Sequence, residues 1–97
     1  MEKERGPWMI HYTELGPAGP DSQLKVEWAF YLREAGRLLA EGHQGKFVLI
    51  KGEEIIGLFD SGIAASTEGH RRYLRGPFLV HQVREWERAV RIPQRYL

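Results

Sequence analysis

The stretch that decides the fold is residues 46–66, KFVLIKGEEIIGLFDSGIAAS. It contains two apolar runs, residues 46–51 and 54–59, separated by Gly52-Glu53. Glycine at the first central position of a two-residue loop favours a type II′ hairpin turn. Both runs carry apolar residues at adjacent positions, which is typical of strands covered on both faces. We therefore predict a β-hairpin whose strands both lie inside a sheet, with neither at an edge.

An amphipathic helix is predicted directly before this hairpin. Apolar residues recur there at the three- and four-residue spacing of one helix face, at Leu24, Trp28, Tyr31, Leu32, Ala35, Leu38 and Leu39. Asp21 or Ser22 can accept hydrogen bonds from the free amides at the helix start. Gly42 or Gly45 can adopt the left-handed conformation that ends it. The apolar face of this helix needs a sheet to pack on, and the hairpin supplies one.

A second helix is predicted over residues 62–75, ended by Gly76-Pro77, and a third strand over residues 78–83. The alternation in residues 8–15 also suits a strand. If that strand is real, the element order is that of a ferredoxin-like split β-α-β unit, and if it is not, a three-stranded sheet with two helices remains. The predicted class is α+β in both cases. The predicted core is Leu24, Trp28, Leu32, Leu39, Phe47, Leu49, Ile56, Leu58, Ala65, Tyr73, Leu79 and Val83.

Length and composition place the chain among ordinary small domains. Its 97 residues are enough for one core, so we expect a single domain over residues 1–97, with 1–7 and 84–97 as tail segments. The sequence contains no cysteine, which excludes disulfides, thiolate nucleophiles and thiolate metal sites. The first residues are charged and lead into no apolar run, and no run is long enough to cross a bilayer. We expect a cytoplasmic protein.

The charges are unevenly distributed along the chain. Residues 1–70 carry seven Lys/Arg and eleven Asp/Glu, whereas residues 71–97 carry seven Arg and two Glu. Arginines interleaved with aromatic side chains are a feature of surfaces that bind single strands or phosphate backbones. The candidate interaction residues are Arg71, Arg72, Arg84, Trp86, Arg88, Arg91 and Tyr96. The alternative is a tail whose aromatic side chains dock on the domain while its arginines face solvent.

Asp60-Ser61-Gly62 matches the signature of an aspartic peptidase, which would require a dimer to bring two carboxylates together. The surrounding residues argue against that interpretation, because a helical pattern begins at Ser61 and only 37 residues follow Asp60. Asp-Ser is also the expected pair where a strand passes into a helix, since either side chain can cap the exposed amides. We therefore predict that Asp60 or Ser61 is a structural cap.

Residues 43–83 resemble a family of small uncharacterised bacterial proteins, a domain of unknown function. The shared pattern falls on Gly45-Lys46, Gly57, Asp60-Ser61, Ala65, Gly69, Tyr73, Phe78-Leu79-Val80 and Gln82-Val83. The resemblance implies a common fold and a bacterial source. It implies no activity.

The sequence offers no catalytic or metal-binding constellation. The four histidines are scattered, and no His-x-x-x-His pair lies on a helix. We expect neither an enzyme nor a cofactor. The predicted function is a non-catalytic interaction module for another protein or a second copy, because exposed sheet edges invite pairing. The apolar anchors of the tail would add to that surface, and they are Trp86, Val90, Ile92, Tyr96 and Leu97. Nucleic-acid binding through the arginine-rich C-terminal region is the alternative.

Overall fold

The computed structural model describes residues 9–88. In chain order the elements are β1 (Met9–His11), the 3-10 helix η2 (Tyr12–Glu14), α1 (Lys25–Ala40), β2 (Phe47–Lys51), β3 (Glu54–Phe59), α2 (Gly62–Arg72), β4 (Leu79–Gln82) and β5 (Trp86–Arg88). The predicted α+β class is confirmed. The second helix is shorter than predicted, since it ends at Arg72 and not at residue 75.

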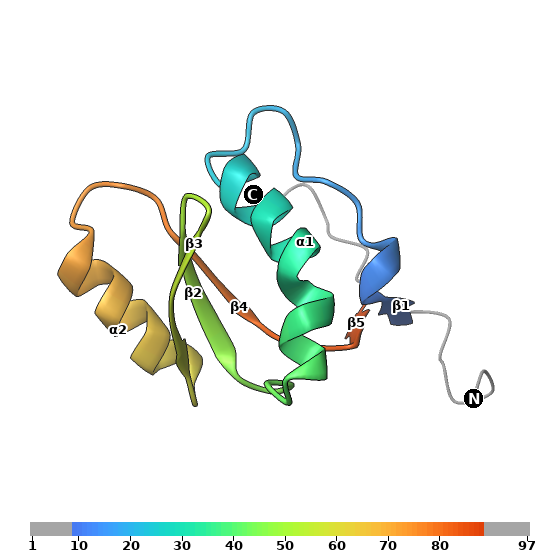
Figure 1. The fold of residues 1–97 in the computed structure, drawn as a ribbon. Coiled ribbons are helices and arrows are strands. Elements are labelled where there is room, and N and C mark those ends of the chain that lie inside the picture. Colours follow the sequence, from blue (N-terminus) through green and yellow to red (C-terminus); the bar gives the residue numbers. More distant parts are fainter. Residues whose placement is uncertain (1–8, 89–97) are drawn as a thin grey trace.

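The strands form two separate antiparallel sheets. One has three strands in the order β3-β2-β4, and the other pairs β1 with β5. Helices α1 and α2 lie on opposite faces of the three-stranded sheet, and the small sheet lies beyond α1 (Figure 1). The ferredoxin-like arrangement is therefore wrong, because β1 is a real strand that pairs with β5 and not with the hairpin. Residues 86–88 were expected in a tail, but they form β5, and residues 89–97 lie outside the described part.

The predicted hairpin is confirmed, with Lys51 opposite Glu54 across the turn. Gly52 has a φ of 62°, and no non-glycine residue between 9 and 88 has a positive φ. The left-handed residue therefore stands only at the first central position, as a type II′ turn requires. Within the hairpin Leu49 pairs with Gly57 and Ile50 with Ile55, which leaves Ile56 as the extra residue of a β-bulge.

The prediction that neither hairpin strand is an edge is wrong for β3. Strand β4 pairs with the other side of β2, so β2 is central and both β3 and β4 are edge strands. Local sequence could not show this. Which hairpin strand pairs with β4 depends on contacts between segments some 30 residues apart in the chain, such as the pair Val48 and His81.

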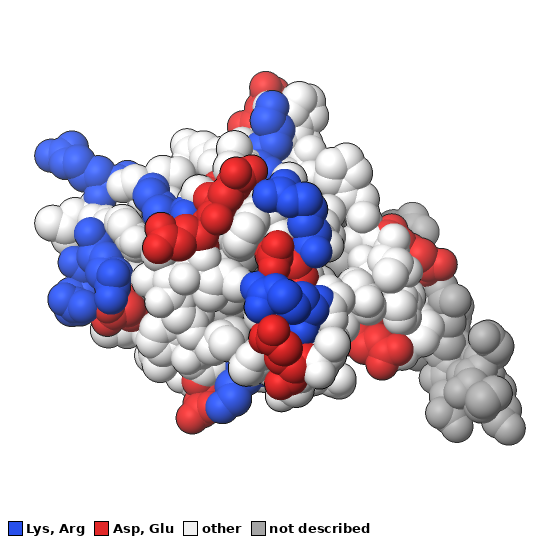
Figure 2. All heavy atoms as spheres, in the orientation of Figure 1, with Lys and Arg blue, Asp and Glu red and all other residues white. Residues whose placement is uncertain are grey.

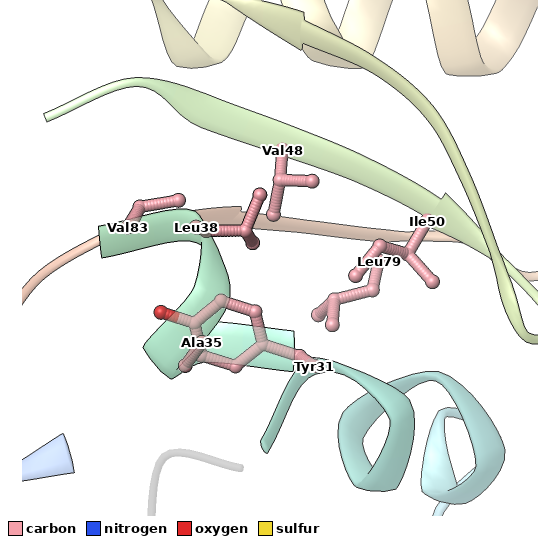
Figure 3. Packing of buried hydrophobic residues seen from close by; sticks show 7 residues of the cluster. All are labelled: Tyr31, Ala35, Leu38, Val48, Ile50, Leu79 and Val83. Carbon is pink, nitrogen blue, oxygen red and sulfur yellow. The ribbon is translucent and has the colours of Figure 1, made fainter. Parts of the chain in front are cut away.

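The main core lies between α1 and the three-stranded sheet. It consists of Tyr31, Ala35, Leu38, Val48, Ile50, Leu79 and Val83, which point toward one another in Figure 3. On the other face of the sheet, Leu49 of β2 and Ala65 of α2 are fully buried. Of the predicted core, Leu49, Ala65, Leu79 and Val83 are buried. Trp28, Leu32 and Leu39 are partly buried at the flanks, because the buried helix face runs through Tyr31, Ala35 and Leu38.

The predicted stop of α1 is found at Gly42. Its φ is 86°, and its amide donates to the carbonyl of Leu39, while the amide of His43 donates to that of Leu38. These two bonds define a Schellman motif, which needs a residue without a Cβ at its left-handed position. At the start of the helix, the prediction that Asp21 or Ser22 caps the free amides is wrong. The N-cap residue is Leu24, which makes no side-chain cap hydrogen bond, and the Ser22 hydroxyl accepts a hydrogen bond from the amide of Leu24 itself at 3.0 Å.

Helix α2 packs closely on the sheet through Gly69. A Cβ at this position would overlap the ring of Phe78. That ring is held in place by His70, at 5.1 Å between ring centroids, and by Tyr73, at 6.3 Å. Glycine is a weak helix former. Here its lack of a side chain makes the contact between the helix and the segment before β4 possible.

Gly69→Ala is expected to lower the free energy of unfolding by up to about 2 kcal/mol, because overpacking costs about 1–3 kcal/mol and the gain in helix propensity offsets about 1 kcal/mol of it. Urea denaturation measures the change. In a Phe78→Leu background, the smaller side chain leaves room for the methyl group, so the same substitution should be neutral or stabilising. A Gly69→Ala protein at least as stable as the parent would contradict the packing described.

Candidate interaction surfaces

The structure divides the predicted interaction residues into two separate places. Arg71 and Arg72 lie in the last turn of α2, whereas Trp86 and Arg88 lie in β5 and Arg84 shortly before it. Helix α2 and strand β5 lie on opposite sides of the three-stranded sheet (Figure 1). The remaining two, Arg91 and Tyr96, lie outside the described residues. The described members of the set therefore do not form one continuous basic surface.

The arginines of α2 are paired within their own helix. Glu68 accepts hydrogen bonds from Arg71 at 2.6 and 3.1 Å and from Arg72 at 2.5 Å. These bonds lower the pKa of Glu68 from 4.5 to about 2. Lys and Arg side chains gather at the left of Figure 2, over the C-terminal part of α2, with acidic atoms beside them. Glu68 therefore offsets one of the two positive charges of this arginine pair, which weakens the case for a phosphate-binding surface.

The residues near β5 are engaged in local contacts as well. Arg84 donates two hydrogen bonds to the side-chain carbonyl of Gln82, at 2.6 and 2.9 Å. The Trp86 ring packs edge-on against His11, with 4.9 Å between centroids. Nε2 of His11 lies 3.2 Å from the Glu85 carboxylate. Trp86 is thus part of the contact between β5 and β1.

Ser61 is the N-cap residue of α2, since its hydroxyl accepts a hydrogen bond from the Ala64 amide at 3.0 Å. The interpretation of Asp60 as the cap is corrected, because its carboxylate pairs with Lys46 at 2.5 Å. This contact lowers the pKa of Asp60. An aspartic peptidase needs two carboxylates that share a proton. An exposed carboxylate paired with a lysine at a helix start does not favour that chemistry.

A buried polar cluster joins β5 to the rest of the domain. The Glu87 side chain is 10% exposed, and its carboxylate lies 3.0 Å from Nε2 of His81. The His81 ring packs against that of Tyr31, with 4.7 Å between centroids. The Tyr31 hydroxyl makes no hydrogen bond of ordinary geometry with the described residues. Burial and the Glu87 carboxylate raise the pKa of Tyr31 to about 12, so the hydroxyl stays neutral.

Sequence reasoning also missed the buried carboxylate of Glu27, which is 6% exposed. It accepts a hydrogen bond of 2.7 Å from the backbone amide of Gly52, and so fixes the hairpin turn against α1. Glu27 is charged and so is not among the apolar residues from which this helix is predicted. The available signal was its position four residues before Tyr31, in line with the buried stripe.

A shallow pocket of about 230 Å³ lies between the loop before α1, the helix itself and β4. It is lined by Ala18, Ser22, Leu24, Trp28 and Leu79. The Ser22 hydroxyl is occupied by the Leu24 amide. The pocket therefore offers apolar contacts, and its lining residues provide no charged group for catalysis.

Among residues 9–88 no strand pairs with the outer side of β3, and this free edge is the most distinctive surface that they form. Residues 55–59, IIGLF, carry no charge and no proline, and each is half-buried. The paired residues Val48, Leu49 and Ile50 of β2 are 0% exposed. Edge strands are usually protected by charges, proline or a covering element. Strand β3 has the composition of a central strand in an edge position.

Two features define the length of the regular edge of β3 and the charge around it. The bulge at Ile56 interrupts the ladder, so the regular part of the strand is Gly57–Phe59. The charged residues that flank the strand are paired within the chain. Before it, Glu53 lies 3.2 Å from Arg33, and after it Asp60 lies 2.5 Å from Lys46. Apart from Glu54 at its first position, the edge is therefore apolar, and the charged residues on either side of the strand are paired.

Comparison with models of known protein families, with curated proteins and with solved structures found no match. The resemblance of residues 43–83 to small bacterial proteins accordingly stays a prediction. Within residues 9–88, neither helix has the length and apolarity needed to span a membrane. The same residues hold no group of three or more His, Cys, Asp or Glu arranged to bind a metal ion.

Ser61→Ala is expected to lower the free energy of unfolding by about 1 kcal/mol, the usual cost of a lost N-cap. Asp60→Ala should cost less, because its side chain is 89% exposed and an exposed ion pair contributes little. Urea denaturation of both variants provides the comparison. If Asp60→Ala proves the more damaging, the assignment of the cap to Ser61 is wrong.

The side-chain carboxyl of Glu68 should titrate with a midpoint of about 2 in a carbon-detected NMR titration. Because the folded-state pKa lies below 4.5, the stabilisation is fully present above pH 4.5 and is lost as the pH falls toward 2. In an Arg71→Gln/Arg72→Gln variant the midpoint should rise toward 4.5. Lys46→Gln, on a different element, serves as the control and should leave it unchanged.

Proposed function

We propose that this protein is a non-catalytic protein-interaction module that binds an extended strand of a partner at the free edge of β3. The partner strand would extend the three-stranded sheet by β-augmentation, with backbone hydrogen bonds supplying affinity and side-chain contacts supplying specificity. The proposed setting is the cytoplasm of a bacterium, where a chain without cysteine needs no oxidising environment.

The observation that carries this proposal is the contrast between the two strands of the hairpin. Both have apolar residues on both faces, yet β2 is fully buried at Val48–Ile50 while β3 is half-buried throughout residues 55–59. An added strand would pair the outer backbone groups of β3 and cover its side chains on both faces. The sequence of β3 is thus suited to a strand with neighbours on both sides.

A protein strand fits this surface better than a nucleic acid does. Nucleic-acid binding depends on unneutralised cations near the phosphates. Arg71 and Arg72 share Glu68, and Arg84 donates two hydrogen bonds to Gln82. The residues of the β3 edge, by contrast, offer apolar side chains and backbone groups, and backbone pairing needs no charge.

Selection of a phage-displayed random peptide library on the folded chain tests the proposal. Enriched peptides should be extended and rich in β-branched or aromatic residues, and their binding should shift the amide resonances of residues 55–59 in ¹⁵N-labelled protein. Shifts confined to the α2 arginines or to the pocket beside Trp28 would contradict it, and so would a failure to enrich any binder.

Ile56→Glu provides the matched variant. Ile56 is the bulge residue and has no partner in β2. A charge at this position therefore disfavours strand pairing at the free edge more than it destabilises the fold. The variant should weaken peptide binding roughly ten-fold or more, since the charge must be desolvated. Ile63→Glu, the same change at an 81% exposed position on α2, should bind as the parent does. Thermal unfolding of both variants checks that they remain folded.

A further inference from the structure

Building on the proposed function, we propose that the strand bound at the β3 edge is β3 of a second copy of this chain. The two copies would be related by a two-fold axis at Leu58, and their three-stranded sheets would join into one six-stranded antiparallel sheet. The partner at the free edge of β3 is then a second copy, and the position of the axis determines the register of the two β3 strands.

The bulge determines where the axis lies. It divides β3 at Ile56 and leaves Gly57, Leu58 and Phe59 as the regular run next to the free edge. When an antiparallel strand pairs with a copy of itself, the central residue faces its own equivalent. Within this run the central residue is Leu58, and Gly57 then lies opposite Phe59 of the second copy.

The side chains of this register are complementary. Leu58 lies opposite Val48 on the face covered by α1, and it packs against the core there. Gly57 lies opposite Leu49 and Phe59 opposite Phe47, so both face α2. The Phe59 ring already lies over Gly57 of its own strand, within 3.0 Å of where a Cβ would stand. Two-fold pairing places each glycine beside two aromatic rings, which cover the backbone that a glycine leaves exposed.

Charge also favours a second copy over a charged partner. A surface that pairs with itself must not carry net charge, because each charge would meet its own sign across the axis. Glu53 and Asp60, which flank the strand, are paired with Arg33 and Lys46. Glu54 is the one charged residue within β3, and it lies at the end remote from Leu58. The α2 arginines, which would repel a second copy, are on another element.

The paired run is short, so the dimer is expected to be weak and in fast exchange. Sedimentation velocity should show an average mass that rises from monomer toward dimer between about 10 µM and about 1 mM, the range of small transient interfaces. Ile56→Glu should raise the dissociation constant roughly ten-fold or more, because it brings a carboxylate near Asp60 of the second copy. Ile63→Glu should leave the constant unchanged.

The contact itself is identified by isotope-filtered NMR on a mixture of ¹³C,¹⁵N-labelled and unlabelled chains. Intermolecular NOEs between Gly57 of one copy and the Phe59 ring of the other would establish the register. A chain that stays monomeric to about 1 mM would overturn the second copy as the occupant, as would a dimer whose NOEs lie elsewhere. The peptide selection tests the proposed strand binding whether or not the chain forms a dimer. Selected peptides that bind β3 of a monomeric chain would retain that function and replace only the partner.

Discussion

The structure depends on the complete burial of β2. Val48, Leu49 and Ile50 are 0% exposed, because β3 and β4 pair with the two edges of this strand while α1 and α2 cover its two faces. Strands β3 and β4 and both α-helices contact β2 directly, and the small sheet is joined to this unit through Glu87 of β5 and His81 of β4. In a chain of 97 residues, one fully enclosed strand is the centre around which a single core can form.

Enclosing β2 has consequences for its neighbours. With three strands in the sheet, both β3 and β4 become edges, and their apolar residues are left partly covered. The polypeptide then leaves the sheet and forms β5, which pairs with β1 and is tied back by Glu87 and His81. The arginine-rich C-terminal region is divided by this path, and the outer edge of β3 is left apolar.

Close contacts explain two residues of the helices that their local sequence alone would not favour. Gly69 stands in the middle of α2 because the Phe78 ring occupies the space of a side chain. Glu27 lies on the buried face of α1 because its carboxylate accepts the Gly52 amide at the hairpin turn. In both cases a locally weak choice is compensated by a contact outside the helix that carries it.

The sequence by itself determined the hairpin and its turn, the first helix and its glycine stop, and the α+β class. These follow from side-chain period and from glycine at positions of positive φ, which are properties of a few adjacent residues. Only the tertiary structure decided which strand became central, where β1 paired and how the arginines were distributed. Those outcomes depend on pairings between segments far apart in the chain, such as Val48 with His81 and Met9 with Arg88. The free energy of such a contact belongs to both partners, and neither segment carries a local pattern that specifies the other.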